Sequence, residues 1–285
     1  MRKLNIFAVA ILVVCLATLS FIGGCASTDT DKLKVVTSIS LIAQIVEQVG
    51  GNLVDVVNII PPAQCPGHFD VKPSDIQKLA DADLFLLGGW QGEMFSKELI
   101  DSANNSHLIV ISLDIPSNPK SNWMVPTVHQ EATDRIANAL SQVDAENKSV
   151  YQATAAEYKN TIKVKGAEIQ GRLARENLAN VNVICSGMQA AFLKWVGLNV
   201  VTFYGRPDSL TPQAVKELVD TAKAKNVTLI VDNLQSGQDA GAGIADELGC
   251  SRIILSNFPG GFDNTETWEK AIDYNIDLIL ESITK

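Results

Sequence analysis

The chain has 285 residues and is acidic, with 32 Asp and Glu residues against 23 Lys and Arg residues and a formal net charge of −9 at pH 7. A surface of this sign repels phosphate backbones, so the composition argues against a nucleic-acid-binding protein. A chain of this length can bury one large core or two modest ones, so a pair of lobes is a reasonable expectation.

The N-terminus has the pattern of a bacterial-type lipoprotein signal. A basic start precedes an apolar run from Leu4 to Ile22, and two glycines stand directly before Cys25. The run is also as long as a transmembrane anchor, which needs ~20 residues to span a bilayer. Small residues before a cysteine favour cleavage instead. We therefore expect a signal peptide over residues 1–24, lipid on Cys25 and a polar tether over residues 25–32, which together anchor an extracytoplasmic protein to the outer face of the cell membrane.

Short β-branched apolar segments alternate with helical patterns in both halves of the remaining chain. The expected strands are Leu33–Thr37, Leu53–Ile60, Asp83–Leu87 and Leu108–Ile111, then Val181–Cys185, Val200–Phe203, Val227–Asp232 and Arg252–Leu255. The helices expected in the first half are Leu41–Val49, Ser74–Ala80 and Lys97–Ala103. Continuous apolar strands separated by helices indicate parallel sheets covered on both faces.

The segment between the two halves is polar and rich in Ala, Glu, Lys and Gln, with one break near Val143–Lys148, which predicts helix without strand. The predicted fold class is therefore α/β with two lobes, each a mostly parallel sheet flanked by helices. The expected boundaries are an N-terminal lobe over 33–127, a bridging helical segment over 128–178 and a C-terminal lobe over 179–285. Ligands of such sheets bind beyond the carboxyl ends of the strands.

Several segments, in their order and spacing, carry a likeness to a known family. They are Val35-Val36-Thr37-Ser38, Val49-Gly50-Gly51, Pro61-Pro62 with the later His68, Pro73-Ser74-Asp75-Ile76, Ala82-Asp83-Leu84-Phe85, Trp123 with Pro126, and Tyr274-Asn275-Ile276-Asp277-Leu278-Ile279. Over nearly the whole mature chain they resemble the zinc- and manganese-type solute-binding lipoproteins of ABC transporters. The resemblance implies two lobes bridged by one long helix and a metal ion held by three histidines and a carboxylate from both lobes.

The chain departs from that ligand pattern at most of its positions. Only His68 is retained. Ser121 stands where the family has its second histidine, and the segment Cys185–Gln189 stands where it has the third. Asn257 occupies the place of the family's aspartate. The family's metal site therefore cannot be carried over whole.

Two sulfur-containing pairs offer replacement metal ligands. Cys65 and His68 form a Cys-x-x-His turn after the second strand, a plausible half of a metal site, although an exposed turn with an incidental thiol would look the same. Cys185 ends the first strand of the other lobe and Met188 follows three residues later. This pair would suit a soft ion such as copper(I), although methionine often only packs and buried cysteines are common. We expect a helix N-terminus to lower the pKa of the Cys185 thiol. Asn257 completes the expected metal site.

Other polar residues after the strands are expected to contact the ligand. The possible contacts are Ser121, Trp123, Ser186, Gln189, Asp232 and Asn233, and a larger ligand could also reach Trp195, Tyr204 and Arg206. His107 and His129 lie in no sulfur or carboxylate cluster at metal-ligand spacing, so both are expected to be solvated.

The sequence thus predicts a monomeric, non-enzymatic solute-binding lipoprotein that captures a transition-metal ion between its lobes and delivers it to an ABC transporter permease. Zinc, manganese and copper(I) are the candidate ions. One alternative keeps the receptor role but replaces the ion by a metal chelate or a small organic solute. The other is a thiol redox protein in which Cys65 and Cys185 form a disulfide, which surroundings outside the cytoplasm permit.

Overall fold

The computed structural model describes residues 32–89, 93–115 and 121–284. The expected signal peptide and the lipidated Cys25 lie outside the described residues. Residues Lys32–Lys285 form one compact unit. Within the described residues no helix combines the length and the apolar character needed to cross a membrane.

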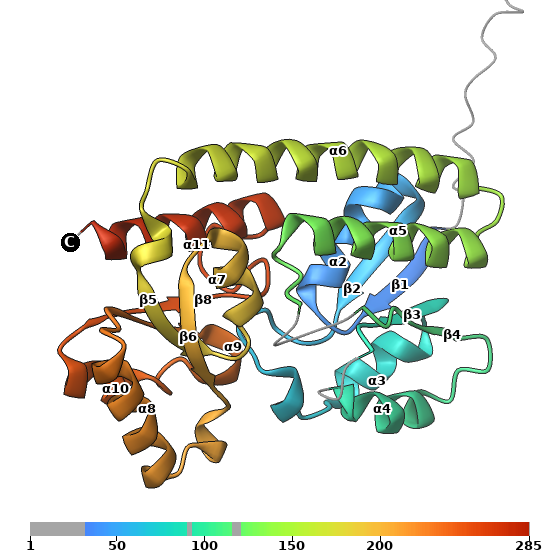
Figure 1. Cartoon of the computed structure of the whole chain (residues 1–285). Coiled ribbons are helices and arrows are strands. Elements are labelled where there is room, and N and C mark those ends of the chain that lie inside the picture. Colours follow the sequence, from blue (N-terminus) through green and yellow to red (C-terminus); the bar gives the residue numbers. More distant parts are fainter. Residues whose placement is uncertain (1–31, 90–92, 116–120, 285) are drawn as a thin grey trace, which may run out of the picture. The chain divides into compact units, whose positions relative to one another are not determined.

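The first sheet is parallel, with the strand order β2-β1-β3-β4. Its strands are β1 (Leu33–Thr37), β2 (Val54–Asn58), β3 (Leu84–Leu87) and β4 (Ile109–Ser112), and its helices are α2 (Ser40–Gly50), α3 (Pro73–Ala80) and α4 (Phe95–Ala103). The central strands β1 and β3 are buried along most of their length because helices cover the sheet (Figure 1). Their continuous apolar runs are the signal by which the sequence predicted them.

The second sheet repeats this arrangement, with the parallel order β6-β5-β7-β8. Its strands are β5 (Asn182–Ser186), β6 (Asn199–Tyr204), β7 (Leu229–Asn233) and β8 (Ser251–Leu255). Its helices are α7 (Ala190–Val196), α8 (Pro212–Ala224), α9 (Leu234–Gly237), α10 (Ala242–Leu248) and α11 (Trp268–Ile283). The predicted fold class of two parallel-sheet lobes flanked by helices is confirmed, and the strands lie within a few residues of their predicted positions.

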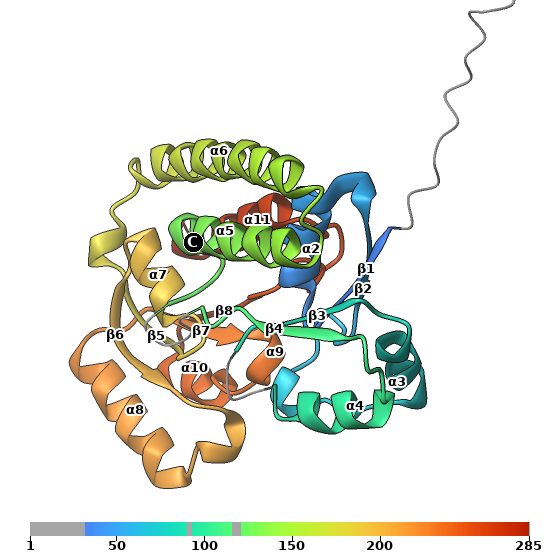
Figure 2. The same ribbon diagram turned by 90° about the vertical axis from the view of Figure 1, so that its right-hand side faces the viewer.

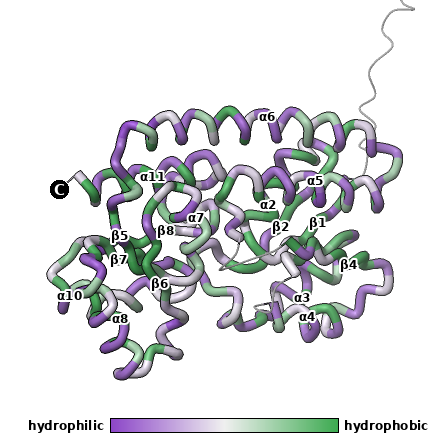
Figure 3. The backbone as a smooth tube through the Cα atoms, in the orientation of Figure 1, coloured by the Kyte–Doolittle hydropathy of each residue, from purple (hydrophilic) through white to green (hydrophobic). Residues whose placement is uncertain are grey.

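Two long helices, α5 (Pro126–Val143) and α6 (Lys148–Leu173), connect the sheets, with the predicted break between them. The hydroxyl of Tyr158 in α6 donates a hydrogen bond to Gln44 Oε1 in α2, at 3.1 Å. Farther along α6, Lys165 Nζ lies 2.9 Å from Asp273 Oδ2 in α11. Helix α6 is therefore attached to a helix of each lobe (Figures 1 and 2). Hydrophobic residues concentrate in the strands of both sheets, whereas much of α6 is hydrophilic (Figure 3).

His129 joins the connecting helices to the second lobe. Its side chain in α5 is fully buried, contrary to the expectation that it is solvated, because it lies on the face of α5 turned toward α6 and α11. Its Nε2 lies 3.0 Å from the Tyr158 hydroxyl, and its ring stacks on Trp268 at a centroid distance of 4.7 Å. Trp268 Nε1 in turn donates to the carbonyl of Met124, at 3.2 Å. His107 is exposed, as expected.

Burial lowers the pKa of His129 from 6.5 to about 3. The unfolded chain therefore binds a proton at this residue between those two pH values while the folded chain does not, so the folded state loses stability as the pH falls below 6.5. We expect the free energy of unfolding to fall by about 1.4 kcal/mol per pH unit between about pH 6 and pH 4 from this residue. Urea denaturation at several pH values measures the slope.

His129→Phe should keep the stacking on Trp268 and remove this part of the slope, whereas His107→Gln, at an exposed position, should leave the slope unchanged. Equal slopes in the wild type and His129→Phe would show that His129 is not held neutral by burial.

Candidate functional site

The loops at the carboxyl ends of the strands of the two lobes meet one another. Gln235 Nε2, after β7, donates to the carbonyl of Pro62, after β2, at 2.8 Å. Ser40 Oγ, at the start of α2, donates to the carbonyl of Pro259, after β8, at 2.8 Å. This is the edge of the sheets at which an open α/β fold binds its ligands.

The center of this contact is an amide cluster made of Asn122, Gln189 and Asn257. Asn257 Oδ1 accepts hydrogen bonds from Asn122 Nδ2 at 2.8 Å and from Gln189 Nε2 at 3.0 Å. Asn122 and Asn257 also both donate to the carbonyl of Met188, at 2.9 and 3.3 Å. The carbonyl oxygen of Asn257 therefore already has two donors, the usual capacity of an amide oxygen, and would have to release one to coordinate a cation.

A second layer of hydrogen bonds holds the backbone of Asn257 in place. Gln235 Oε1 accepts from the Asn257 backbone N–H at 3.1 Å, and Gln235 Nε2 donates to Ser256 Oγ at 2.8 Å. Asn275, in α11, accepts from the Ser256 backbone N–H at 3.1 Å and donates to the Ser256 carbonyl at 2.8 Å. The amide cluster is thus oriented from both sides.

Sequence reasoning missed Asn122 and Asn275. The signal for Asn275 was available: an amide between Ile272 and Ile276, on the apolar stripe of an amphipathic helix, has to find buried partners. Asn122 has no such pattern around it, because its role depends on contact with the other lobe.

Cys65 is the N-cap and His68 the last residue of a single turn of 3-10 helix, Pro66–His68, after β2. The His68 backbone N–H donates to the Cys65 carbonyl at 3.1 Å. This bond closes a four-residue turn, whose first and last residues lie close together, so Cys65 and His68 are neighbours in space. His68 is exposed and Cys65 is half-buried, and both can be reached without unfolding the chain.

Arg206, on the loop after β6, packs against this turn from the second lobe. A methyl group placed on Gly67 would come within 2.7 Å of both Nη1 and Nη2 of Arg206. The guanidinium therefore lies on the glycine backbone between Cys65 and His68. Of the residues expected to reach a larger ligand, Arg206 is the one that the structure brings to the Cys65–His68 turn.

Cys185 lies inside the hydrophobic core, with no exposed surface, paired in register with Phe203 and Val231. Burial raises the pKa of its thiol to about 12, so the expectation of a lowered pKa is wrong: α7 begins only at Ala190, and desolvation outweighs any helix dipole. A neutral core thiol is a poor metal ligand, and we leave Cys185 out of the ligand set. Cys65, Cys185 and Cys250 are free thiols, so the disulfide of the redox alternative is not formed.

The carboxylate of Asp232 is fully engaged at the end of β7. It accepts from Arg252 Nη1 at 2.8 Å, from the Tyr204 hydroxyl at 2.7 Å and from the Gly241 backbone N–H at 2.8 Å. Asp232 and Tyr204 are both buried, so neither is free to meet a ligand. The neighbouring Asn233 caps α9 by accepting from the Ser236 backbone N–H at 2.9 Å.

The remaining expected contacts lie near the amide cluster. Ser186 is buried and its hydroxyl accepts from the Met188 backbone N–H at 3.3 Å. Ser121 and the buried Trp123 flank Asn122 in the segment that leads into α5. Met188 and Gln189 contribute to the cluster itself through a backbone carbonyl and a side chain.

Glu93 is a buried carboxylate at the same edge of the first sheet, which sequence reasoning missed. It accepts hydrogen bonds from the Ser38 hydroxyl, after β1, and from the backbone N–H groups of Gly88 and Gly89, after β3, at 2.9 and 2.8 Å. Glu93 therefore connects the loop after β1 to the loop after β3 through hydrogen bonds.

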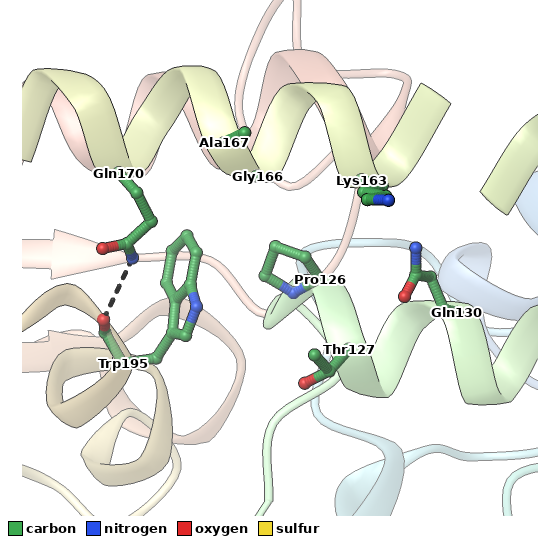
Figure 4. A pocket seen from close by; sticks show the side chains of 8 residues that line it. All are labelled: Pro126, Thr127, Gln130, Lys163, Gly166, Ala167, Gln170 and Trp195. Atoms are coloured by element: carbon green, nitrogen blue, oxygen red, sulfur yellow. Dashed lines mark hydrogen bonds between the residues drawn. The ribbon is translucent and has the colours of Figure 1, made fainter. Parts of the chain in front are cut away.

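No three His, Cys, Asp or Glu residues come together as a metal site within the described ranges. A cavity of about 190 Å³ lies elsewhere, between α5, α6 and Trp195, and includes Lys163 and Gln170 (Figure 4). Trp195 lines that cavity and not the contact between the lobes. None of the expected metal ligands lines it.

Comparison with known proteins finds a family over almost the whole chain. The family model described as zinc-uptake complex component A, periplasmic, matches residues 35–282. A metal ABC transporter substrate-binding lipoprotein of Streptococcus sanguinis is 24% identical over 317 residues, covering 100% of both chains. A manganese-binding lipoprotein of Halalkalibacterium halodurans is 23% identical over 310 residues, covering 98% of each chain.

Solved structures share the fold. The SBP FpvC of Pseudomonas aeruginosa in complex with a nickel ion has a TM-score of 0.75 at 21% identity, covering 89% of this chain and 97% of that one. A crystal structure of ZnuA has a TM-score of 0.73 at 21% identity, covering 88% of this chain and 99% of that one.

The burial of Cys185 predicts a clear order of thiol reactivity. At about pH 8, near the pKa of an ordinary thiol, iodoacetamide should modify Cys65 in the folded protein and leave Cys185 unmodified until denaturant is added. Peptide mass spectrometry measures both positions. Equal rates at the two cysteines in the folded protein would contradict the burial of Cys185.

The amide cluster predicts a loss of stability when its acceptor is removed. Asn257→Ala removes the acceptor of one side-chain N–H of Asn122 and one of Gln189, and we expect the free energy of unfolding to fall by about 1–3 kcal/mol. Asn160→Ala, at an exposed position of α6, is the matched control and should change little. Urea denaturation of the variants gives the difference, and equal midpoints would count against the cluster.

Proposed function

Because the chain belongs to the zinc-uptake complex component A family, we propose that it is the substrate-binding component of an ABC importer and that it captures a transition-metal ion outside the cytoplasm. The match over residues 35–282 carries the proposal, since it includes both lobes and the connecting helices. Relatives named as metal-binding lipoproteins match over essentially the full chain.

We propose Cys65 and His68 as the metal ligands of the first lobe. Their shared turn after β2, their accessibility and the contact of this loop with the second lobe support this role. A thiolate with an imidazole favours zinc or copper(I) over manganese, which prefers oxygen ligands. The cargo completes its coordination with water, with an anion or with groups of the second lobe.

Asn257 is a weaker candidate than sequence reasoning made it. Coordination through Oδ1 would cost a hydrogen bond to Asn122 or Gln189 and leave a buried donor unpaired, a loss of about 1–3 kcal/mol. This free-energy cost would weaken metal binding, so we do not assign Asn257 as a metal ligand.

The proposed transport role consists of capture, delivery and release, with no reaction in this chain. We propose that lipid on Cys25 holds the protein at the outer face of the membrane and that, as a monomer, it hands the metal to the permease of the transporter. Helix α6, bonded to α2 and α11, limits how far the lobes can separate. Release then depends on the permease.

Elemental analysis of the purified protein tests the function. After exposure to zinc, manganese or copper(I) under reducing conditions and removal of free metal, we expect one equivalent of zinc or copper to remain bound. Cys65→Ser and His68→Ala should each weaken binding by at least about 10–100-fold, the effect of losing even an outer-shell partner.

Cys250→Ser and His107→Ala remove the same chemical groups at other positions and should leave binding unchanged. If no metal remains bound, the proposed cargo is wrong. If Cys65→Ser and His68→Ala retain full affinity, the ligands lie elsewhere.

A further inference from the structure

We propose that Arg206 binds an oxyanion that enters together with the metal ion, so that the cargo is a metal complex carrying a carboxylate or phosphate group. This inference rests on the proposed function, because it concerns the form in which the ion reaches the Cys65–His68 turn. It makes Arg206 a specificity-determining residue of the second lobe.

The guanidinium of Arg206 stands out from the other half-buried arginines. Arg135 lies 2.7 Å from Glu131, Arg252 lies 2.8 Å from Asp232, and Arg172 pairs with Asp277. Arg206 has no side-chain hydrogen bond or ion pair with any residue that the structure describes. Its backbone carbonyl accepts from the hydroxyl and the backbone N–H of Ser209. Its planar fork of donors is therefore available, and such a fork fits a carboxylate or phosphate with two parallel hydrogen bonds.

Arg206 lies next to the proposed metal ligands. Both terminal nitrogens lie against Gly67, which stands between the two proposed metal ligands in the sequence. A group bound to this guanidinium would therefore lie beside the Cys65–His68 turn. A substituent on residue 67 would push the guanidinium away, and the glycine leaves it room.

Charge balance explains why an anion is needed. A bare divalent cation at Cys65 and His68 would lie near a fixed positive charge and would be repelled. The groups at the contact itself do not offset this charge: Asp232 is engaged by Arg252, Tyr204 and Gly241, and the amide cluster is neutral. An oxyanion that coordinates the metal and accepts hydrogen bonds from Arg206 removes the repulsion and fills the open coordination positions.

Calorimetric titration of the full-length protein in detergent tests this. The probes are zinc chloride, equimolar zinc citrate, and zinc chloride with phosphate. Citrate competes for zinc in solution, so a protein that takes the bare ion must bind more weakly when citrate is present. We expect the opposite in the wild type: tighter binding of the zinc–oxyanion complex than of zinc chloride.

Arg206→Gln should lose this gain, about tenfold or more for one charge-assisted hydrogen bond, and should bind zinc chloride more tightly because a positive charge is removed. Arg175→Gln, which removes an exposed arginine just after α6, is the matched control and should behave as the wild type. A gain with citrate alone assigns an organic carboxylate, and a gain with phosphate assigns an inorganic oxyanion.

If citrate and phosphate weaken zinc binding equally in the wild type and in Arg206→Gln, the inference is overturned while the proposed function stands. If zinc binds under none of these conditions, the proposed function itself fails.

Discussion

Every buried amide at the contact between the lobes must find hydrogen-bond partners, and this constraint organises the edge where the ligand is expected. Asn257 sits at its center, accepting from Asn122 of the segment before α5 and from Gln189 of the second lobe. Gln235 and Asn275 hold the surrounding backbone, and Gln235 also bonds to Pro62 in the first lobe. The strand-end loops of both sheets are thereby linked by hydrogen bonds between neutral groups. Gln189 Oε1 is a buried acceptor of this cluster that has no hydrogen-bond partner among the described residues.

The neutral amides at the contact between the lobes do not offset the positive charge of a metal ion. Carboxylate ligands offset the charge of a divalent ion, whereas amides leave it to be balanced by the ion's other partners. The ionisable groups beside the contact include Cys65, His68 and the guanidinium of Arg206, which lies on Gly67. The chain has the fold of its family, and its binding chemistry has to be argued from its own residues, because fold and site are separable.

The connecting helices determine how the lobes are held. His129 is packed between Tyr158 and Trp268 and is kept neutral, because a charged imidazole in that position would lose its hydration. Tyr158 continues the chain of hydrogen bonds to Gln44 in the first lobe. Side chains from α2, α5, α6 and α11 thus share one joint, and ion pairs of α6 with Asp273 and Asp277 reinforce it at the surface.

The sequence by itself determined the two parallel sheets and the helical connection, because hydrophobic periodicity and β-branched runs are local signals. It also predicted a Cys65–His68 turn after the second strand, where ligands of such folds bind, and the structure has that turn after β2. It could not tell that Cys185 is a core thiol, that His129 is buried or that Asp232 is already paired with Arg252. Those outcomes, like the amide cluster and the placement of Arg206 on Gly67, depend on contacts between residues far apart in the chain, and burial and partner choice are decided only when the elements pack.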